Sequence, residues 1–171
     1  MKFIREYAFI PITIIAAILV NTFIIVNARI PSASMENTIS VGDRLFGNRL
    51  AYISSAPQRY DIVIFKAPDK KNTLYIKRII GLPGETITVK DGIPYINGEI
   101  DPNGTKYAYT NGDIDGDGVF KIPEDCYFVM GDNRAESLDA RYWNQHYITR
   151  KDIVAKAVLR YWPLNKIKVL S

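Results

Sequence analysis

The sequence from Ile30 to Asp43 reads IPSASMENTISVGD and follows the only segment of the chain that is apolar enough to cross a membrane. It contains Ser34, whose small neighbours would let the backbone of a substrate approach closely. A serine hydroxyl attacks a carbonyl carbon only when a base removes its proton. The stretch therefore indicates a hydrolytic nucleophile, and the alternative is an ordinary loop after an apolar helix, where Ser and Pro are common.

Two residues could supply the base. His146 is the only histidine, so a Ser-His-Asp triad has a single possible base. Lys77 lies in the apolar segment 74–80, and strand alternation places Lys77 and Arg78 on opposite faces. At least one of these two charges must then be buried or paired, and burial makes a lysine lose its proton more easily. Lys77 is thus predicted to be the base, unless the segment is an edge strand whose two cations both extend to water.

Composition excludes several classes of protein. The chain has 171 residues, which leaves room for one domain of about 140 residues after the apolar segment. The net charge is +4 and the Lys and Arg residues are scattered, which argues against nucleic-acid binding. The single cysteine, Cys126, excludes an internal disulfide and is expected to be a buried structural thiol. We expect no metal and no cofactor.

The apolar segment runs from Ala8 to Val26. A helix of roughly 19 residues at about 1.5 Å each spans about 28 Å, close to the thickness of the hydrocarbon layer of a bilayer. The alternative is a signal peptide that is removed from the mature protein. The run is longer than the usual apolar core of a signal peptide, and Asn27-Ala28-Arg29 is a poor cleavage site, so an uncleaved anchor is favoured.

The topology follows from the charges beside this segment. Lys2 and Arg5 precede it, and positive residues favour the cytoplasmic side of a membrane. The sequence therefore predicts a cytoplasmic N-terminus over 1–7, a transmembrane anchor over 8–27 and an extracytoplasmic domain over 28–171.

Beyond residue 29 the pattern is that of short strands. Asp91-Gly92 and Asn97-Gly98 are two of the strongest hairpin signals, and there is little amphipathic helix. This pattern predicts a mainly antiparallel β domain. The expected strands lie at 43–51, 61–65, 74–80, 85–90, 93–96, 125–130 and 155–161.

Four stretches downstream of the apolar segment resemble the four conserved boxes of the type I signal peptidases, also called leader peptidases, and they occur in the family's order. These stretches are 31–35, 59–65, 75–85 and 131–141. The resemblance covers essentially the whole chain. It implies a membrane-bound serine endopeptidase that removes N-terminal signal peptides from exported preproteins, with a mainly β catalytic domain and a small β insert at roughly 85–125.

The resemblance also implies roles for individual residues. Ser34 matches the nucleophile of the family and Lys77 matches its general base. Ser32 matches the position whose hydroxyl, together with the backbone N–H of Ser34, forms the oxyanion hole in some members. Ser137 matches the serine that hydrogen-bonds the lysine amine.

Further positions match supporting residues. Asp139 and Arg141 match an ion pair beside the site, and Arg78 matches an arginine with a structural role. Two positions depart from the family pattern, because Asn37 stands where a proline is usual and Tyr60 where a glycine is frequent. We expect these departures to affect the local backbone rather than the chemistry.

The resemblance implies preprotein substrates with small residues at the first and third positions before the cut, and it places the protein in the cell membrane as a single-pass monomer. A specialised relative that serves conjugation or pilus assembly is an alternative within the family. A catalytically silent membrane-tethered domain is disfavoured because both Ser34 and Lys77 are present. Contact with membrane lipid is expected from Leu45, Phe46, Tyr52, Ile53 and Trp162.

One further motif is independent of the family. Residues 113–124 place acids at positions one, three and five, Gly at six and Glu at twelve, which is the pattern of a calcium-binding EF-hand loop. No amphipathic helix precedes the loop, and Pro123 stands before the last acid. A solvated Asp-Gly turn explains the same residues, and any calcium bound here would be structural.

Overall fold

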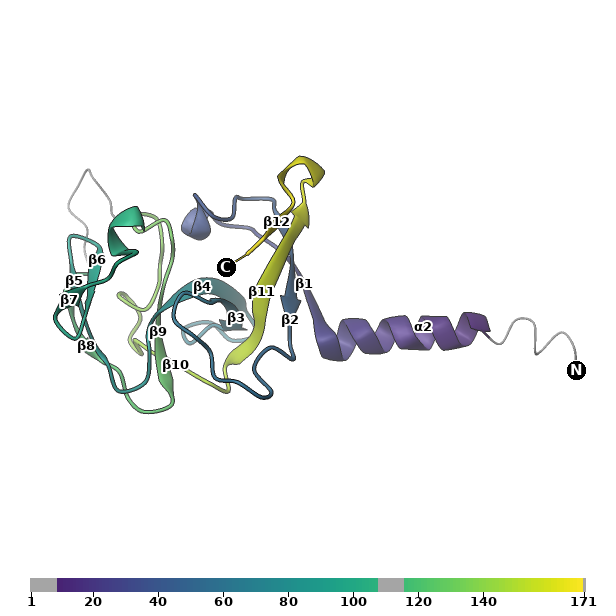
Figure 1. The fold of residues 1–171 in the computed structure, drawn as a ribbon, viewed down its shortest axis with the longest axis horizontal. Helices are drawn as coiled ribbons and strands as arrows, with labels where there is room; N and C mark the ends of the chain where they lie inside the picture. Colours follow the sequence, from purple (N-terminus) through teal and green to yellow (C-terminus); the bar gives the residue numbers. More distant parts are fainter. Residues whose placement is uncertain (1–8, 108–115, 171) are drawn as a thin grey trace, which may run out of the picture.

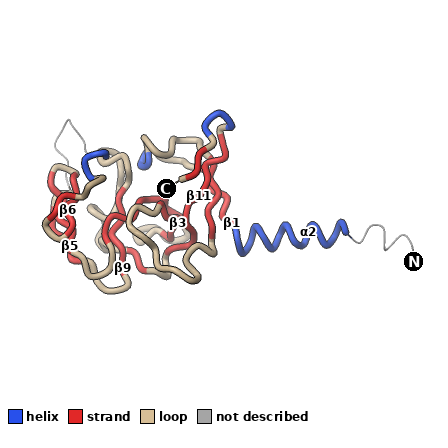
Figure 2. The backbone as a smooth tube through the Cα atoms, viewed as in Figure 1, coloured by secondary structure: helices blue, strands red, loops and turns tan. Residues whose placement is uncertain are grey.

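The structure, a computed structural model, describes residues 9–107 and 116–170. Two antiparallel sheets make up its folded part, and helix is confined to one N-terminal segment and short turns (Figures 1 and 2). The larger sheet has eight strands in the order β1-β2-β11-β3-β4-β9-β10, with β12 beside β11, and the smaller has the order β7-β6-β5-β8. The prediction of a mainly antiparallel β domain is therefore confirmed.

The larger sheet combines strands from both ends of the described chain. The long strand β11 lies between β2 and β3, so the C-terminal part of the chain closes the sheet. Its strands are β1 (Ile25–Arg29), β2 (Arg44–Asn48), β3 (Ile62–Lys66), β4 (Leu74–Gly81), β9 (Cys126–Met130), β10 (Ile148–Thr149), β11 (Ile153–Trp162) and β12 (Lys168–Val169).

The smaller sheet is built by the chain between β4 and β9. Its strands are β5 (Thr86–Lys90), β6 (Ile93–Ile96), β7 (Glu99–Ile100) and β8 (Gly118–Lys121). Asp91 and Gly92 have φ angles of 51° and 71°, and Asn97 and Gly98 have φ angles of 50° and 91°. Two consecutive residues with positive φ form the tight turn whose twist matches a hairpin, as the two dipeptides predict.

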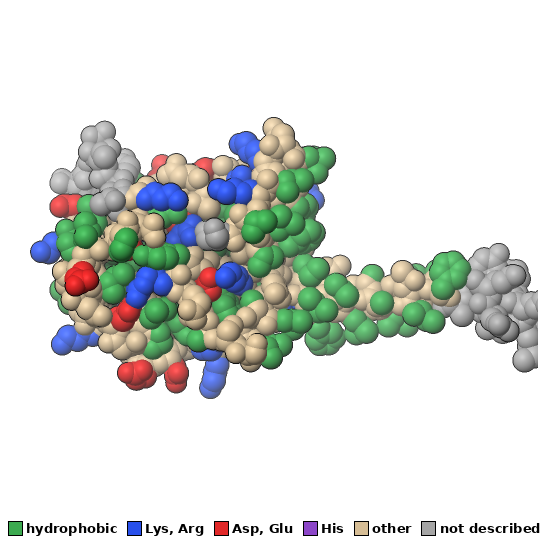
Figure 3. Space-filling model, viewed as in Figure 1, with side chains coloured by type: hydrophobic (Ala, Val, Ile, Leu, Met, Phe, Trp, Pro, Cys, Tyr) green, Lys and Arg blue, Asp and Glu red, His purple; other side chains and the backbone are tan. Residues whose placement is uncertain are grey.

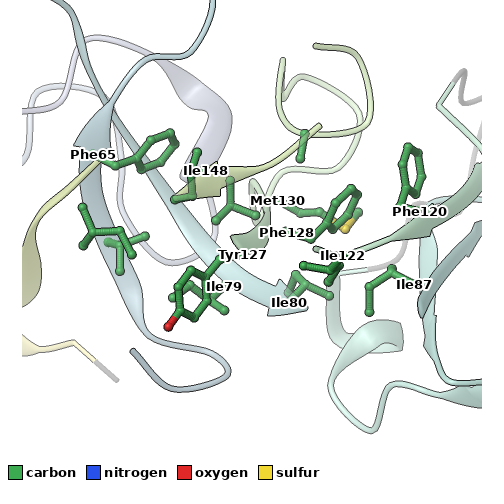
Figure 4. Close-up of a cluster of buried hydrophobic side chains, with 14 of the residues drawn as sticks. Phe65, Ile79, Ile80, Ile87, Phe120, Ile122, Tyr127, Phe128, Met130 and Ile148 are labelled. Carbon is green, nitrogen blue, oxygen red and sulfur yellow. The ribbon is translucent and has the colours of Figure 1, made fainter. Parts of the chain in front are cut away.

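A shared core joins the two sheets. Figure 4 shows Ile80 and Phe128 of the larger sheet near the side chains of Ile87 and Phe120 from the smaller one, with Phe65 and Ile148 at the opposite end of the same cluster. Each fully buried side chain of this size contributes about 1.5–3 kcal/mol of transfer free energy, so the cluster fixes β4 and β9 firmly. These are the strands that carry the candidate site.

The N-terminal helix α2 (Phe9–Leu19) continues into a π-helical turn, Val20–Ile24, and buries no side chain. It extends away from the sheets with apolar side chains on its surface (Figures 1 and 3). No helix within 9–107 and 116–170 combines the length and the hydropathy that a membrane crossing needs.

Strand β1 begins earlier than the sequence suggests. The apolar segment is expected to be one helix through Val26, but the structure places Val26 in β1, paired with Gly47 of β2. Val26 is buried in a small cluster with Ile64 and Ala155. These residues are β-branched or small and pack closely in the sheet. The chain at Val26 therefore forms a strand and does not continue the helix.

The predicted lipid-contacting set is only partly exposed. Leu45 and Tyr52 are buried, which contradicts their expected role: Leu45 lies in a core cluster with Ile30, and the hydroxyl of Tyr52 donates to Asp61 at 2.8 Å. Ile53 and Trp162 are exposed, at 75% and 47%.

Candidate active site

Ser34 lies in a single 3-10 turn, Ala33–Met35, between β1 and β2. Its side chain is only 6% exposed. The turn is attached to the loop after β9, because the backbone N–H of Asn133 donates to the Ser34 carbonyl at 3.1 Å and its side-chain amide donates to the Ala33 carbonyl at 3.2 Å. These bonds hold Ser34 against a segment that is a hundred residues away in the chain.

Gly131 makes this approach possible. A Cβ atom at position 131 would overlap the carbonyl oxygen of Ser34 and the hydroxyl of Ser137. Only glycine therefore fits between the two serines. No pattern in the sequence points to this role of Gly131.

Lys77 lies in the middle of β4, opposite Val63 of β3. Its side chain is 5% exposed, and within the described residues it forms no ion pair and no hydrogen bond. Burial lowers the pKa of Lys77 from 10.5 to about 8; the charge of Asp139 opposes this shift and the charge of Arg141 adds to it. A large fraction of the amine is thus neutral near pH 8.

One cavity brings the predicted nucleophile and base together. Ser32, Ser34 and Lys77 all line a cavity of about 350 Å³. The hydroxyls of Ser32 and Ser34 lie 3.5 Å apart. No hydrogen bond joins Ser34 to Lys77 in the described structure, and such bonds are often long before a substrate is bound.

The cavity also contains an open sheet edge. Residues 74–77 of β4 line it, and β9 pairs with β4 only from Arg78 onward. On the side away from β3, this part of β4 therefore has no partner strand among the described residues. An open edge offers unpaired backbone N–H and C=O groups to an extended peptide.

Asp139 and Arg141 form the ion pair that the resemblance implies, at 2.8 Å and fully buried. Asp139 also accepts a bond from the backbone N–H of Gly131 at 2.9 Å, and Arg141 donates to the carbonyl of Arg134 at 2.8 Å. Burial depresses the pKa of Arg141, and its bonds to Asp139 more than offset this, so the pKa is raised. The pair fastens the loop that holds Ser34.

Arg78 points away from the cavity and is fully paired. It donates to both carboxylate oxygens of Asp132, at 2.9 and 2.8 Å, and to the carbonyl of Tyr60 at 2.8 Å. Thr38 donates to the same carboxylate at 2.6 Å. Asp132 was not identified from the sequence as this partner. Its place directly after β9, in Gly131-Asp132-Asn133-Arg134, marks it as a candidate site residue but does not reveal which cation it pairs with.

Ser137 and His146 are two further candidates. Ser137 is buried beside Gly131, and its hydroxyl has no hydrogen-bond partner in the described part of the chain, so the expected bond to Lys77 is not formed. His146 donates to the Ala140 carbonyl at 2.7 Å, packs on Phe120 and is not among the described residues that line the cavity.

Both departures from the family pattern fall on unusual backbone. Asn37 has φ 77° and Tyr60 has φ 70°, which is the left-handed region. Asn tolerates this region, whereas a proline is restricted to a φ near −65°, so a proline could not adopt the backbone found at Asn37. Tyr60 is strained there, and its hydroxyl donates to Asp101 at 2.6 Å.

The calcium motif is only partly described, because 113–115 lie outside the described residues. Asp117 accepts a bond from the backbone N–H of Asp91 at 3.0 Å, and the following residues form β8. The described residues contain no cluster of three or more metal-ligating side chains. Cys126 is half-buried rather than buried, because it begins the strand β9.

Comparison with known proteins identifies the family of this chain. The family model described as signal peptidase, peptidase S26, matches residues 3–162. Signal peptidase I of Leptolyngbya laminosa is 36% identical over 169 residues, which cover 95% of this chain and 81% of that protein. The probable signal peptidase I-2 of Synechocystis is 37% identical over 166 residues, covering 92% and 72%. Signal peptidase I P of Bacillus subtilis subsp. natto is 37% identical over 164 residues, covering 92% and 88%.

Among solved structures, a signal peptidase I from Enterococcus faecalis is similar, with a TM-score of 0.49 and 31% identity over 60% of this chain and 97% of that one. The protein is a serine endopeptidase. It belongs to the signal peptidase family, peptidase S26, whose members are membrane-associated in general.

Proposed function

We propose that this enzyme cleaves N-terminal signal peptides from exported preproteins, with Ser34 as nucleophile and Lys77 as general base. One observation carries the proposal: a buried lysine without a partner among the described residues lines the same cavity as a buried serine. The names of the relatives, all signal peptidase I, support the choice of substrate.

Acylation begins with the neutral amine of Lys77, which accepts the proton of the Ser34 hydroxyl as the oxygen attacks the carbonyl carbon of the substrate. The tetrahedral oxyanion accepts hydrogen bonds from the Ser32 hydroxyl and the Ser34 backbone N–H, as the family resemblance implies. One such donor stabilises the transition state by roughly 3 kcal/mol. The Lys77 ammonium then gives its proton to the departing amine, which is the new N-terminus of the mature protein.

Deacylation uses the same base. Neutral Lys77 removes a proton from a water molecule, which attacks the acyl-enzyme, and the proton returns to Ser34 as the signal peptide leaves. No step in this sequence requires a metal or a redox group. The ion pair between Asp139 and Arg141 holds the loop at Gly131 in place. Ser137, whose hydroxyl makes no bond to Lys77 in the described structure, is the residue that the family resemblance assigns to orienting the amine.

The open edge of β4 is suited to bind the substrate. An extended peptide that adds to residues 74–77 would run past Lys77 and bring one carbonyl to Ser34. Backbone pairing of this kind gives affinity without sequence specificity, and shallow neighbouring pockets select the side chains. A protease that acts on many preproteins needs binding that depends little on sequence, together with selection at only a few side chains.

We further propose the membrane arrangement. The anchor is a single pass that ends at Ile24, residues 1–7 are cytoplasmic, and the extracytoplasmic catalytic domain begins with β1 at Ile25 and has an insert at roughly 85–125. The exposed apolar side chains of α2, with Ile53 and Trp162 on the domain, support contact with lipid. The enzyme acts as a monomer in this arrangement.

The test is cleavage of a labelled preprotein by the purified full-length protein in detergent, with the cut mapped by mass spectrometry. We expect one cut at the end of the signal peptide, and none with Ser34→Ala. A cut elsewhere, or cleavage by Ser34→Ala above a few per cent of the wild-type rate, would refute the proposal.

A further inference from the structure

A second cavity adjoins the catalytic one. It has a volume of about 810 Å³ and lies between the turn that connects β3 to β4 and the segment 145–152. Lys70, Thr73 and Leu74 line both cavities, so the two are neighbours along the same strand end. We call this second space the lysine cavity.

Four lysines line the lysine cavity, and all are exposed. They are Lys66, Lys70, Lys71 and Lys151. None of them forms an ion pair within 9–107 and 116–170. These residues lie in two separate segments of the sequence, and the fold brings them together around the lysine cavity.

Little negative charge opposes them. Among the described residues, Asp152 is the one acid that lines the lysine cavity, and its Oδ2 atom accepts two bonds from Thr149, at 2.8 Å from the backbone N–H and 2.7 Å from the hydroxyl. Within the described lining, four positive charges therefore face one negative charge, and one of the two oxygens of that carboxylate is already hydrogen-bonded. A hollow lined by one sign of charge concentrates its field and attracts the opposite sign.

The lysine cavity lies within reach of a peptide in the catalytic cavity. Leu74, which lines both, is three residues from Lys77 on the same strand, and at about 3.3 Å per residue this separation is about 10 Å. A substrate that extends along the open edge of β4 advances by the same rise. Its residues three or more positions from the scissile bond therefore pass over the lysines.

We propose that the lysine cavity binds carboxylate side chains of the preprotein about three to six residues from the scissile bond, and so favours substrates that are acidic there. This inference rests on the proposed function, since it needs a peptide bound along β4. The shared lining and the short distance favour a peptide carboxylate over a lipid phosphate.

The test uses two pairs of peptides that span a cleavage site. In one pair, the peptides differ only in having Asp or Ser three to six residues before the cut; in the other pair, they differ in the same way three to six residues after the cut. For wild-type enzyme in detergent, kcat/KM should be about three- to tenfold higher for the Asp peptide than for the Ser peptide in one of the two pairs. This ratio should approach one in about 1 M salt, where the Debye length is about 3 Å. Equal rates for Asp and Ser peptides on both sides would overturn the inference.

Charge reversal makes the test specific. Lys71→Glu combined with Lys151→Glu should reverse the ratio and favour peptides with Lys in place of Asp. Lys121→Glu is the matched control, since Lys121 is exposed on β8 of the other sheet, and it should leave the ratio unchanged.

Two other outcomes separate the alternatives. If the double variant keeps the wild-type ratio but loses binding to anionic phospholipid vesicles, the lysine cavity serves a lipid headgroup and the inference is wrong. If wild-type enzyme cleaves none of the peptides, the proposed function fails and this inference fails with it, whereas equal cleavage of all peptides refutes this inference alone.

Discussion

The two faces of strand β4 bury one positive charge each, and the charges have opposite surroundings. Lys77 and Arg78 are consecutive, and they are 5% and 3% exposed. Arg78 donates to both oxygens of Asp132 and to the carbonyl of Tyr60, whereas Lys77 has no bonded partner among the described residues.

These surroundings decide whether a buried cation is structural or reactive. Burial lowers the pKa of both side chains, but the bonds and charge of Asp132 outweigh it for Arg78, whose pKa is raised. An arginine stays charged in any case and suits a permanent ion pair. A lysine left without a partner loses its proton instead, which is what a general base requires.

The largest expected effect is on activity. Lys77→Met should lower kcat/KM by at least about 10³-fold, because the base is lost while the apolar surroundings still accommodate the side chain. The measurement is cleavage of a labelled preprotein. His146→Ala is the control and should retain the wild-type rate; an equal loss there would make histidine the base.

The second effect is on stability. Arg78→Met should lower the free energy of unfolding by about 3–5 kcal/mol, because it leaves the buried carboxylate of Asp132 without its cation. Urea unfolding monitored by fluorescence measures it. Lys66→Met, an exposed change at the end of β3, should alter stability by less than about 0.5 kcal/mol. An Arg78→Met loss as small as the control would mean that the pair is not structural.

The third effect runs in the opposite direction. The folded-state pKa of Lys77 is about 8 and its ordinary value is 10.5, so below pH 8 the protonated amine destabilises the fold by about 3 kcal/mol. The unfolded state binds more protons between these two values, so wild-type stability rises with pH across that window. Lys77→Met should therefore be more stable than wild type at pH 7, and the advantage should shrink toward pH 10.

The measurement is urea unfolding of both proteins at the two pH values. Ser34→Ala serves as a second inactive variant and should follow the wild-type pH dependence. An advantage of Lys77→Met that is the same at both pH values would show that packing, not desolvation, is its origin.

The sequence predicts most of the strands, because they are short apolar segments separated by strong turns. Asp91-Gly92 and Asn97-Gly98 predict both hairpins of the smaller sheet correctly. The start of β1 at Ile25 could not be predicted, since Ile and Val fit an apolar helix as well as a strand. Only the packing of Val26 against distant residues decides the outcome.

The site is predictable in its parts but not in its pairings. Charges on both faces of β4 indicate that one is buried, yet Asp132 lies 54 residues beyond Arg78, and no local pattern reveals which cation it pairs with. The need for glycine at position 131 depends on two serines that approach only in the folded protein. The lysine cavity likewise exists only because the fold brings Lys71 near Lys151.

Titration of Lys77 itself shows whether its amine can act as the general base. In the Ser34→Ala protein with carbon-13-labelled lysine, the Cε resonance of Lys77, assigned by its loss in Lys77→Met, reports the protonation of the amine. We expect a midpoint near pH 8, well below the ordinary lysine value of 10.5. A midpoint at the ordinary value of 10.5 would mean that Lys77 is protonated at working pH and would contradict its assignment as the base.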